Sequence, residues 1–349
     1  MNYRGRNFQL LIVIPFLLFL FIVSCSLAEE PFVCDRTPIY SLSFANENTG
    51  WAVGECGTVL KTEDGGETWQ EQESQTTAWL ESAFFINEQI GWAVGWNGFI
   101  MKTDDGGINW QIQNSGTQET LYDIYFVDEL KGWASGGDKT VLKTIDGGQT
   151  WEIITSVSGQ NTIYSIYFLD ENIGWAVGSG DTRLTTDDGG DRWHPIAINP
   201  NFRGVFQYVE FVEDQTGFMF GARYDPPGAS KSGKSVQTVL KTSNGGKNWD
   251  EYIISRWEWG QSPYVIYSAD FMDIEIGWAI GYGDRGSAVY ETTDGGETWQ
   301  LIREYPEIEL TAIYATNSEQ VLVAGGKDTP EYSQSSVILD VKEGIQLYP

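Results

Sequence analysis

Apolar and polar residues alternate in a six-residue segment that occurs seven times along the chain. The copies are IYSLSF (39–44), LESAFF (80–85), LYDIYF (121–126), IYSIYF (163–168), FQYVEF (206–211), IYSADF (266–271) and LTAIYA (310–315). Alternation with a period of two is typical of a β-strand that has one buried face. Each copy is therefore predicted to be the first strand, strand A, of a repeated unit.

A short apolar segment follows each copy of strand A and is predicted to be strand B. It begins with Gly-Trp at 50–51, 91–92, 132–133, 174–175 and 277–278, and with Gly217-Phe218 in the fifth unit. A segment like VLKT (strand C) and a segment opened by a tryptophan (strand D) complete each unit. In the seventh unit the four strands are predicted in TAIYA, QVLVAG, SVILDV and IQLYP.

Between strands C and D, six of the units carry one motif. Its copies are TEDGGETW (62–69), TDDGGINW (103–110), TIDGGQTW (144–151), TDDGGDRW (186–193), TSNGGKNW (242–249) and TTDGGETW (292–299). Successive closing tryptophans are 41, 41, 42, 56 and 50 residues apart, and a period near 41 matches one four-stranded propeller blade. The chain is therefore predicted to be all-β, a seven-bladed β-propeller of four-stranded antiparallel blades over residues 39–349.

The motif is expected to form the turn from strand C to strand D. Its third residue would accept backbone N–H groups, its two glycines would adopt positive φ, and its tryptophan would pack between neighbouring sheets. Six copies cannot all serve one active site, so the motif is predicted to be structural. The residues concerned are Asp64, Asp105, Asp146, Asp188, Asn244 and Asp294, with Trp69, Trp110, Trp151, Trp193, Trp249 and Trp299.

The motif is an Asp-box, or BNR repeat. Together with the Gly-Trp-Ala-Val-Gly segment it resembles the photosystem II stability and assembly factor family of cyanobacteria and chloroplasts and its bacterial relatives, over essentially residues 39–349. The resemblance implies a seven-bladed propeller that assists a membrane-protein precursor through an arginine-rich patch on one face. The repeat motifs do not map that patch residue by residue onto this chain, so none of the family's functional residues is carried over.

Residues 1–24 have the pattern of a signal peptide, with Arg4 and Arg6 before an apolar stretch of 14 residues from Leu10 to Val23. Ser24-Cys25 ends this stretch like a lipobox, which predicts lipidation of Cys25 and a tether over 25–38. Cleavage after Ala28, giving a protein without a lipid anchor, is the alternative. Either way the chain is expected to leave the cytoplasm, and with the lipid anchor it would be held at the periplasmic, lumenal or outer cell surface.

Loss of Arg4 and Arg6 would change the net charge from -28 to -30, which argues against nucleic acid as a partner. Besides Cys25 the chain has only Cys34 and Cys56. They are predicted to form a disulfide in an oxidising compartment, the alternative being two unpaired thiols. The single histidine, His194, has no cysteine or second histidine with which to bind a metal, so neither a metal nor a cofactor is predicted.

The Asp-box also occurs in sialidases and other glycoside hydrolases, so an enzyme is the rival prediction. Sialidases usually have an Arg-Ile-Pro segment, which is missing here because Arg36 is followed by Thr37-Pro38. Endoglucanases with this motif place their carboxylates between two propellers, whereas this chain has the length for one. The chain is therefore predicted to be a non-catalytic, monomeric binding or assembly module, with a glycan-binding or glycan-cleaving propeller as the alternative.

Insertions beyond the 41-residue period fall at 224–237, 253–264 and 327–335, in connections from B to C or from D to A. These connections should lie on the face opposite the Asp-boxes, and long loops on a rigid scaffold are common binding sites. The few positively charged residues, and the aromatic residues that the repeated motifs do not account for, are also expected on that face. The predicted partner-binding residues, with Trp257, Trp259, Arg223 and Arg256 as anchors, are Arg203, Arg223, Tyr224, Lys231, Lys234, Arg256, Trp257, Trp259, Tyr264, Arg285, Trp79 and Trp96.

The partner on that face is expected to be a protein, such as a membrane-protein assembly intermediate, or a glycan. The alternative is that the insertions have no binding role and that the aromatic residues only cover the ends of the propeller.

Overall fold

The computed structural model of the chain describes residues 38–154, 161–196, 203–224, 235–256, 265–283, 286–317, 320–327, 336–344 and 346–348. Contacts divide the chain into the units Met1–Val33 and Cys34–Pro349, and all described residues belong to the second. Within these described ranges, no helix has the length and apolar character needed to cross a membrane. The predicted leader (1–24), Cys25 and Cys34 lie outside the described residues, as do Lys231, Lys234, Trp257, Trp259, Tyr264 and Arg285.

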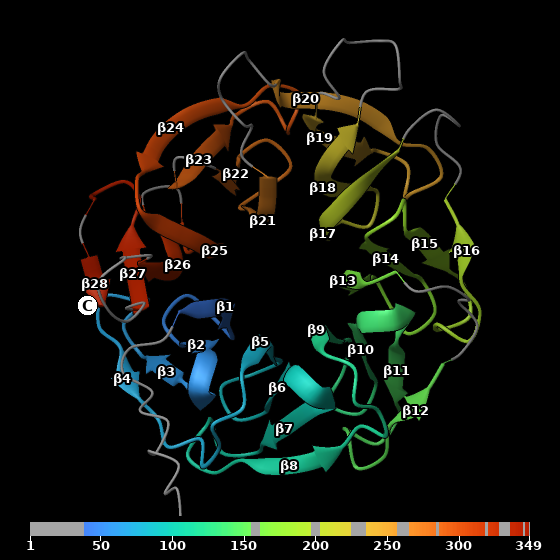
Figure 1. Cartoon of the computed structure of the whole chain (residues 1–349), viewed down its shortest axis with the longest axis vertical. Helices are drawn as coiled ribbons and strands as arrows, with labels where there is room; N and C mark the ends of the chain where they lie inside the picture. The colour runs from blue at the N-terminus through green and yellow to red at the C-terminus, as the bar shows by residue number, and fades with distance from the viewer. Residues whose placement is uncertain are drawn as a thin grey trace, which may run out of the picture. The chain divides into compact units, whose positions relative to one another are not determined.

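The second unit contains seven antiparallel sheets of four strands, each paired in chain order from A to D. Every strand A contacts the strand A of the next sheet, and the last one contacts the first, so the seven sheets close a ring around the innermost strands (Figure 1). This confirms the predicted seven-bladed propeller. Each blade is built from one continuous stretch of sequence, including the seventh, which lacks the Asp-box.

The strands of each kind have the following bounds. Strands A are β1 (Ile39–Phe44), β5 (Leu80–Phe85), β9 (Leu121–Phe126), β13 (Ile163–Phe168), β17 (Arg203–Glu213), β21 (Val265–Phe271) and β25 (Ile308–Ala315). Strands B are β2 (Gly50–Gly54), β6 (Gly91–Gly95), β10 (Gly132–Gly136), β14 (Gly174–Gly178), β18 (Thr216–Tyr224), β22 (Gly277–Gly283) and β26 (Val321–Lys327).

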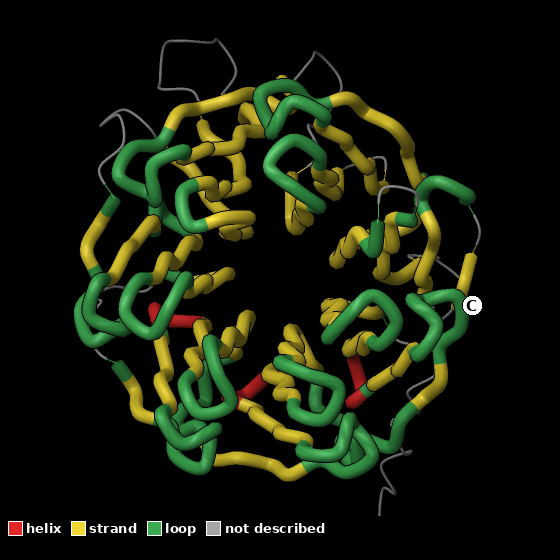
Figure 2. Tube along the Cα trace, turned by 180° about the vertical axis from the view of Figure 1, so that it is seen from behind, coloured by secondary structure: helices red, strands yellow, loops and turns green. Residues whose placement is uncertain are grey.

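Strands C are β3 (Val59–Thr62), β7 (Phe99–Thr103), β11 (Val141–Thr144), β15 (Arg183–Thr186), β19 (Ser235–Thr242), β23 (Gly286–Thr292) and β27 (Ser336–Asp340). Strands D are β4 (Gln70–Glu71), β8 (Gln111–Asn114), β12 (Glu152–Ile153), β16 (His194–Pro195), β20 (Asp250–Arg256), β24 (Gln300–Tyr305) and β28 (Gln346–Tyr348). In three neighbouring blades the B-to-C turn is a short 3₁₀ helix, drawn in red in Figure 2: η1 (Glu55–Gly57), η2 (Trp96–Gly98) and η3 (Gly137–Lys139).

Two of the predicted insertions are partly strand. In blade 5, β18 and β19 continue their pairing through Arg223↔Val236 and Tyr224↔Ser235, so residues 235–237 are not loop as predicted. Likewise β20 extends to Arg256 and takes in the first residues of the predicted 253–264 insertion. The reason is that the inserted residues lengthen an existing ladder, whose backbone groups gain partners, before the chain turns.

Each strand A contains a β-bulge, which the alternating pattern did not predict. In every blade the register with strand B shifts between the first and third residues of the six-residue segment, as at Ile163 and Ser165. The second residue, Tyr164 in this example, is therefore extra and has no partner on strand B. The bulge resets the alternation, so that residues two and three of the segment can both face the centre of the ring.

In the Asp-box turns the third residue of the motif accepts hydrogen bonds from the residues around it. In blade 3, Asp146 Oδ1 accepts the Thr144 hydroxyl at 2.9 Å and the Thr150 backbone N–H at 2.9 Å, while Gly147 and Gly148 have φ of 71° and 87°. Asn244 accepts the equivalent two bonds in blade 5. In the seventh blade, Asp340 accepts the N–H groups of two following residues, so a turn aspartate persists although the glycine pair is gone.

Neighbouring blades are joined by the tryptophan of strand B. Trp133 in blade 3 is 1% exposed, stacks on Phe168 of blade 4 at 3.5 Å between ring centroids, and donates its indole N–H to the Gly189 carbonyl at 2.9 Å. The Asp-box Trp193 packs edge-on against the same Phe168 ring. Trp51 and Trp92 make the same stack and the same hydrogen bond to the next blade.

The joints beside the irregular blades use other residues. Blade 5 has Phe218 in place of tryptophan, stacked on Phe271 at 4.1 Å. Blade 7 has no Asp-box, and the indole of Trp278 in blade 6 donates instead to Glu291 at 3.0 Å. Where blade 7 meets blade 1, Leu322 lies against Gly66, and Phe44 stacks on Tyr314.

Candidate functional site: the channel and the non-box face

Hydrogen bonds between turns define two faces of the propeller. In blade 3 the Asp-box N–H of Gly147 donates to Leu130 in the A-to-B turn, which places these turns together on what we call the box face. In blade 2 the N–H of Trp96, in the B-to-C turn, donates to the Trp79 carbonyl in the D-to-A connection. These turns lie on the opposite, non-box face, in agreement with the predicted strand order.

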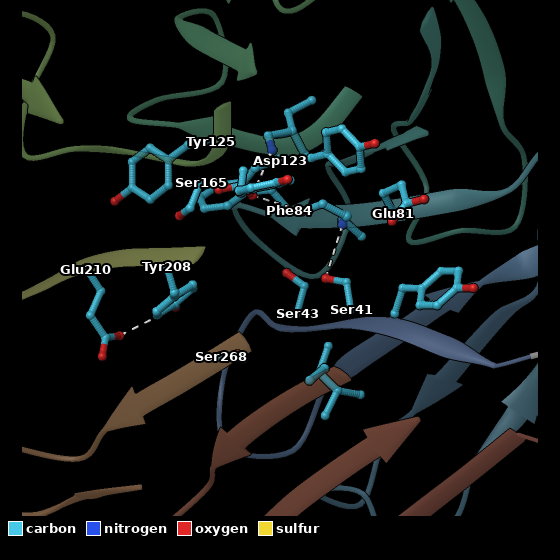
Figure 3. Close-up of a pocket in the computed structure, with 18 of the residues that line it drawn as sticks. Ser41, Ser43, Glu81, Phe84, Asp123, Tyr125, Ser165, Tyr208, Glu210 and Ser268 are labelled. Atoms are coloured by element: carbon cyan, nitrogen blue, oxygen red, sulfur yellow. Dashed lines mark hydrogen bonds between the residues drawn. The ribbon is translucent and has the colours of Figure 1, made fainter. Parts of the chain in front are cut away.

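A cavity of about 360 Å³ runs along the centre of the ring and is lined by strand A of all seven blades (Figure 3). The second, third and fifth residues of the six-residue segment line it in every blade, which gives three layers. The non-box layer consists of Tyr40, Glu81, Tyr122, Tyr164, Gln207, Tyr267 and Thr311. The middle layer consists of Ser41, Ser82, Asp123, Ser165, Tyr208, Ser268 and Ala312. The box layer consists of Ser43, Phe84, Tyr125, Tyr167, Glu210, Asp270 and Tyr314.

The non-box layer combines four tyrosines with one acid, Glu81, and Glu55 of the blade 1 B-to-C turn lies beside it. The Tyr40 hydroxyl donates to Glu55 Oε1 at 2.5 Å, and Trp96 donates its indole N–H to Glu81 Oε1 at 2.5 Å. Burial raises the pKa of Glu81, and the nearby Glu55 charge adds to the shift. Burial and Glu81 likewise raise the pKa of Tyr122. The end of the channel on the non-box face is thus aromatic and electronegative.

Asp123 in the middle layer connects neighbouring blades through hydrogen bonds. Its Oδ1 accepts the Ser82 hydroxyl at 3.1 Å, and its Oδ2 accepts the Ile166 backbone N–H at 2.9 Å, so it links three successive blades. A serine of the middle layer also connects neighbouring blades, because Ser41 Oγ accepts the Ala83 N–H from the next blade. Burial raises the pKa of Asp123 to about 6 despite these hydrogen bonds.

The box layer holds two acids on adjacent blades. Asp270 Oδ2 accepts the Ala315 N–H at 2.6 Å, and burial raises the pKa of Asp270 to about 7. Burial, followed by repulsion from Asp270, raises the pKa of Glu210 well above its usual value. The Tyr208 hydroxyl donates to Glu210 Oε2 at 3.5 Å (dashed line in Figure 3), whereas Glu210 Oε1 is buried without a hydrogen-bond partner. The two carboxyls therefore resist simultaneous ionisation.

The structure brings two of the predicted partner-binding residues together. Trp79 and Trp96 lie on the non-box face of blade 2 with ring centroids 4.1 Å apart, and Trp96 is 42% exposed. Arg223 lies away from them in blade 5 and forms an ion pair with Glu251, Nε to Oε1 at 2.5 Å. Of Arg203, Tyr224 and Arg256 only the backbone is described, at the ends of β17, β18 and β20.

The predicted disulfide is described on one side only. Cys56 lies in η1, on the non-box face, and takes part in a disulfide whose partner is outside the described residues, so pairing with Cys34 stays a prediction. His194 is exposed in β16. The described ranges contain no group of three histidine, cysteine or acidic side chains placed to hold a metal ion.

The channel acids Glu81, Asp123, Glu210 and Asp270 were not predicted from sequence. A signal was present: aligned on strand A, Asp123 stands where blades 1, 2, 4 and 6 have serine, and Glu210 and Asp270 stand where blades 3, 4 and 7 have tyrosine. Such a departure from the repeat indicates a position where one blade carries a side chain of different chemistry from the other blades.

Residues 34–115 and 108–220 match the family model described as photosynthesis system II assembly factor YCF48, and together they make up more than half of the chain. The chain belongs to the YCF48 family. Residues 290–301 match the BNR/Asp-box repeat model. No curated protein matches the chain in sequence.

Solved YCF48 structures have the same fold as this member of the family. The structure of YCF48 bound to D1 peptide is 20% identical with a TM-score of 0.61, covering 84% of this chain and 92% of that one. YCF48 from Cyanidioschyzon merolae is 20% identical with a TM-score of 0.60, covering 84% and 95%. The GH74 xyloglucanase from Xanthomonas campestris is 10% identical with a TM-score of 0.65, and this chain spans 54% of its length.

Proposed function

We propose that this YCF48-family chain is an exported, non-catalytic propeller that binds a protein partner, a segment of a membrane protein during assembly, on its non-box face. The family match is the observation on which the proposal depends. A YCF48 structure with a bound D1 peptide supports a peptide as the kind of ligand. The exposed Trp96 beside Trp79 supports the non-box face, because large aromatic side chains are enriched at binding hot spots.

The channel supports binding over glycan cleavage. Asp123 and Asp270 accept backbone N–H groups of the next blade, so both carboxyls serve the ring itself. No lysine, arginine or histidine is among the residues that line the described cavity, which leaves a sugar carboxylate without a counter-charge. The GH74 likeness is one of fold, at 10% identity. A glycan ligand remains the alternative outcome of the test.

Site-specific photo-crosslinking in native membranes tests the docking face. With p-benzoylphenylalanine in place of Trp96, irradiation should link the chain to a membrane-protein precursor that mass spectrometry identifies. The same group in place of Ile145, which is 67% exposed in the blade 3 Asp-box, should give little or no adduct. Equal adducts from both faces would reject the non-box face, and adducts with glycan alone would favour the alternative function.

Export and anchoring have a separate test. If Cys25 is the lipidated residue, metabolic labelling with palmitate should mark the wild-type chain and should not mark Cys25→Ala. The reason is that the acyl chains are attached to this thiol and to the amino group that cleavage before Cys25 exposes. Absence of label from both chains would contradict lipidation and favour cleavage after Ala28.

A further inference from the structure

The non-box end of the channel has the side chains that recognise an organic cation. Four of its seven lining residues are tyrosines, and Tyr122 and Tyr164 are in contact edge to face at 5.6 Å. Glu81 belongs to the same layer, and Trp96 extends the aromatic surface outward through its hydrogen bond to Glu81. Ammonium and guanidinium groups bind favourably to the faces of such rings, and more strongly beside a carboxylate.

Several acids act on this end of the channel at once. Besides burial, Glu55 and Glu81 both raise the pKa of Tyr40, Glu119 raises the pKa of Tyr122, and Glu309 raises the pKa of Tyr267 on the neighbouring blade. No lysine, arginine or histidine is among the residues that line the described cavity. The lining itself therefore carries no positive charge beside Glu81, and the low-dielectric wall of tyrosines strengthens the field of that carboxylate.

The box layer of the cavity holds two further carboxyls at greater depth. Glu210 Oε1 is buried and accepts no hydrogen bond, and its neighbour Asp270 carries a second carboxyl. Burial makes both carboxyls resist ionisation, so the charge that attracts a cation lies at the non-box mouth. The chain as a whole, with a net charge of -28, attracts a basic partner at long range.

We propose that the non-box mouth of the channel, formed by Glu81, Tyr40, Tyr122, Tyr164 and Trp96, binds the ammonium or guanidinium group of a lysine or arginine side chain of the protein partner. The inference rests on the proposed function, which supplies the protein partner. It adds that the docking segment of this partner must carry a lysine or an arginine. The site itself is a property of this chain and is testable without the partner.

The full chain labelled with 5-fluorotryptophan allows the test by ¹⁹F NMR, with the Trp96 and Trp79 signals assigned through Trp96→Phe and Trp79→Phe. The probes are n-butylammonium and n-butylguanidinium ions, with n-butanol as the neutral match. Both ions should shift these two signals in a saturable way that weakens with added salt. The alcohol should not, because it lacks the charge.

Glu81→Gln should weaken the affinity for both ions at least about tenfold, because a charge-assisted contact is lost. The glutamine can still accept the Trp96 indole N–H, so the pocket should keep its shape. Glu67→Gln makes the same change of net charge on the exposed box face of blade 1 and should leave the affinity within about twofold. Equal loss in both variants, or equal shifts with n-butanol, would overturn the inference.

The two proposals can fail separately. A crosslinked precursor at Trp96 without saturable binding of either ion would leave the docking face standing and overturn the cation site. Saturable binding that Glu81→Gln abolishes, without a precursor adduct, would support the cation site and contradict the assembly role. Peptides with one lysine or arginine, compared with norleucine or citrulline at the same place, should show the same selectivity as the free ions.

Discussion

Trp133→Ala should lower the free energy of unfolding by about 3–5 kcal/mol, the largest effect of any single substitution considered. The change removes a side chain that is 1% exposed, its stack on Phe168 and its hydrogen bond to the Gly189 carbonyl. A cavity would remain between blades 3 and 4, and a buried carbonyl would lose its partner. Urea denaturation followed by far-UV circular dichroism measures the loss.

Two variants make this expectation specific to the joint between blades. Trp133→Phe should cost less, about 1–2 kcal/mol, because blade 5 already joins blade 6 through Phe218 stacked on Phe271. Trp96→Ala removes an indole that is 42% exposed and should change stability by less than about 1 kcal/mol. A Trp133→Ala protein no less stable than Trp96→Ala would show that the stacks do not hold the blades together.

Stability should also fall as the pH rises from about 4 to about 7, by an amount on the order of a few kcal/mol. Asp123 and Asp270 have pKa values raised to about 6 and about 7 by burial, and the pKa of Glu210 is raised as well. The folded state therefore holds these protons more tightly than the unfolded chain does. As the pH rises between the unfolded and folded pKa values, the carboxyls of the unfolded chain ionise while those of the folded state stay protonated. The unfolded state is thereby favoured, and the free energy of unfolding falls.

The Asp-box aspartates act in the opposite direction and in a lower pH window. The Arg192 guanidinium, which donates to Asp188, holds the pKa of that carboxyl at about 2, and the Thr150 hydroxyl lowers the pKa of Asp146. Their contribution is present above about pH 4 and is lost as the pH falls through the folded pKa values. Maximum stability should therefore lie at mildly acidic pH, near 4 to 5.

Melting temperature measured between pH 3 and pH 8 tests this profile. Asp270→Asn with Glu210→Gln should flatten the decline between pH 4 and pH 7, because neither amide titrates. Glu67→Gln, which removes one exposed charge, should leave the decline in place. The two profiles would coincide if general repulsion within a chain of net charge -28, rather than the channel acids, caused the decline.

The repeat made the fold predictable. Seven alternating segments and six Asp-boxes fixed the order and the approximate ends of the strands, because each unit repeats the same pattern of buried positions. The β-bulge in strand A was not predictable in the same way. Its cause is the register with strand B, as between Ile163 and Gly178, which is a property of the paired sheet and not of one segment.

The candidate site was predictable in part. Trp79 and Trp96 were singled out because no repeat explains them, and the structure places them in contact. Glu81, Glu210 and Asp270 were missed because the chain has 49 acidic residues, among which no particular pair stands out. In addition, the alternating pattern of a single strand does not show which polar side chains meet around the ring. The predicted anchors Trp257, Trp259 and Arg256 belong to insertions with no repeat to guide their placement.

The bulge in strand A affects which of its residues can change without loss of the fold. The first residue of the six-residue segment is buried in every blade, whereas the second, third and fifth residues line the channel in every blade. A substitution at the second residue, as at Glu81, can therefore change the channel lining while the buried first residue keeps its place in the ring. Propellers of this kind can thus change the chemistry of the channel by single substitutions while the fold is kept.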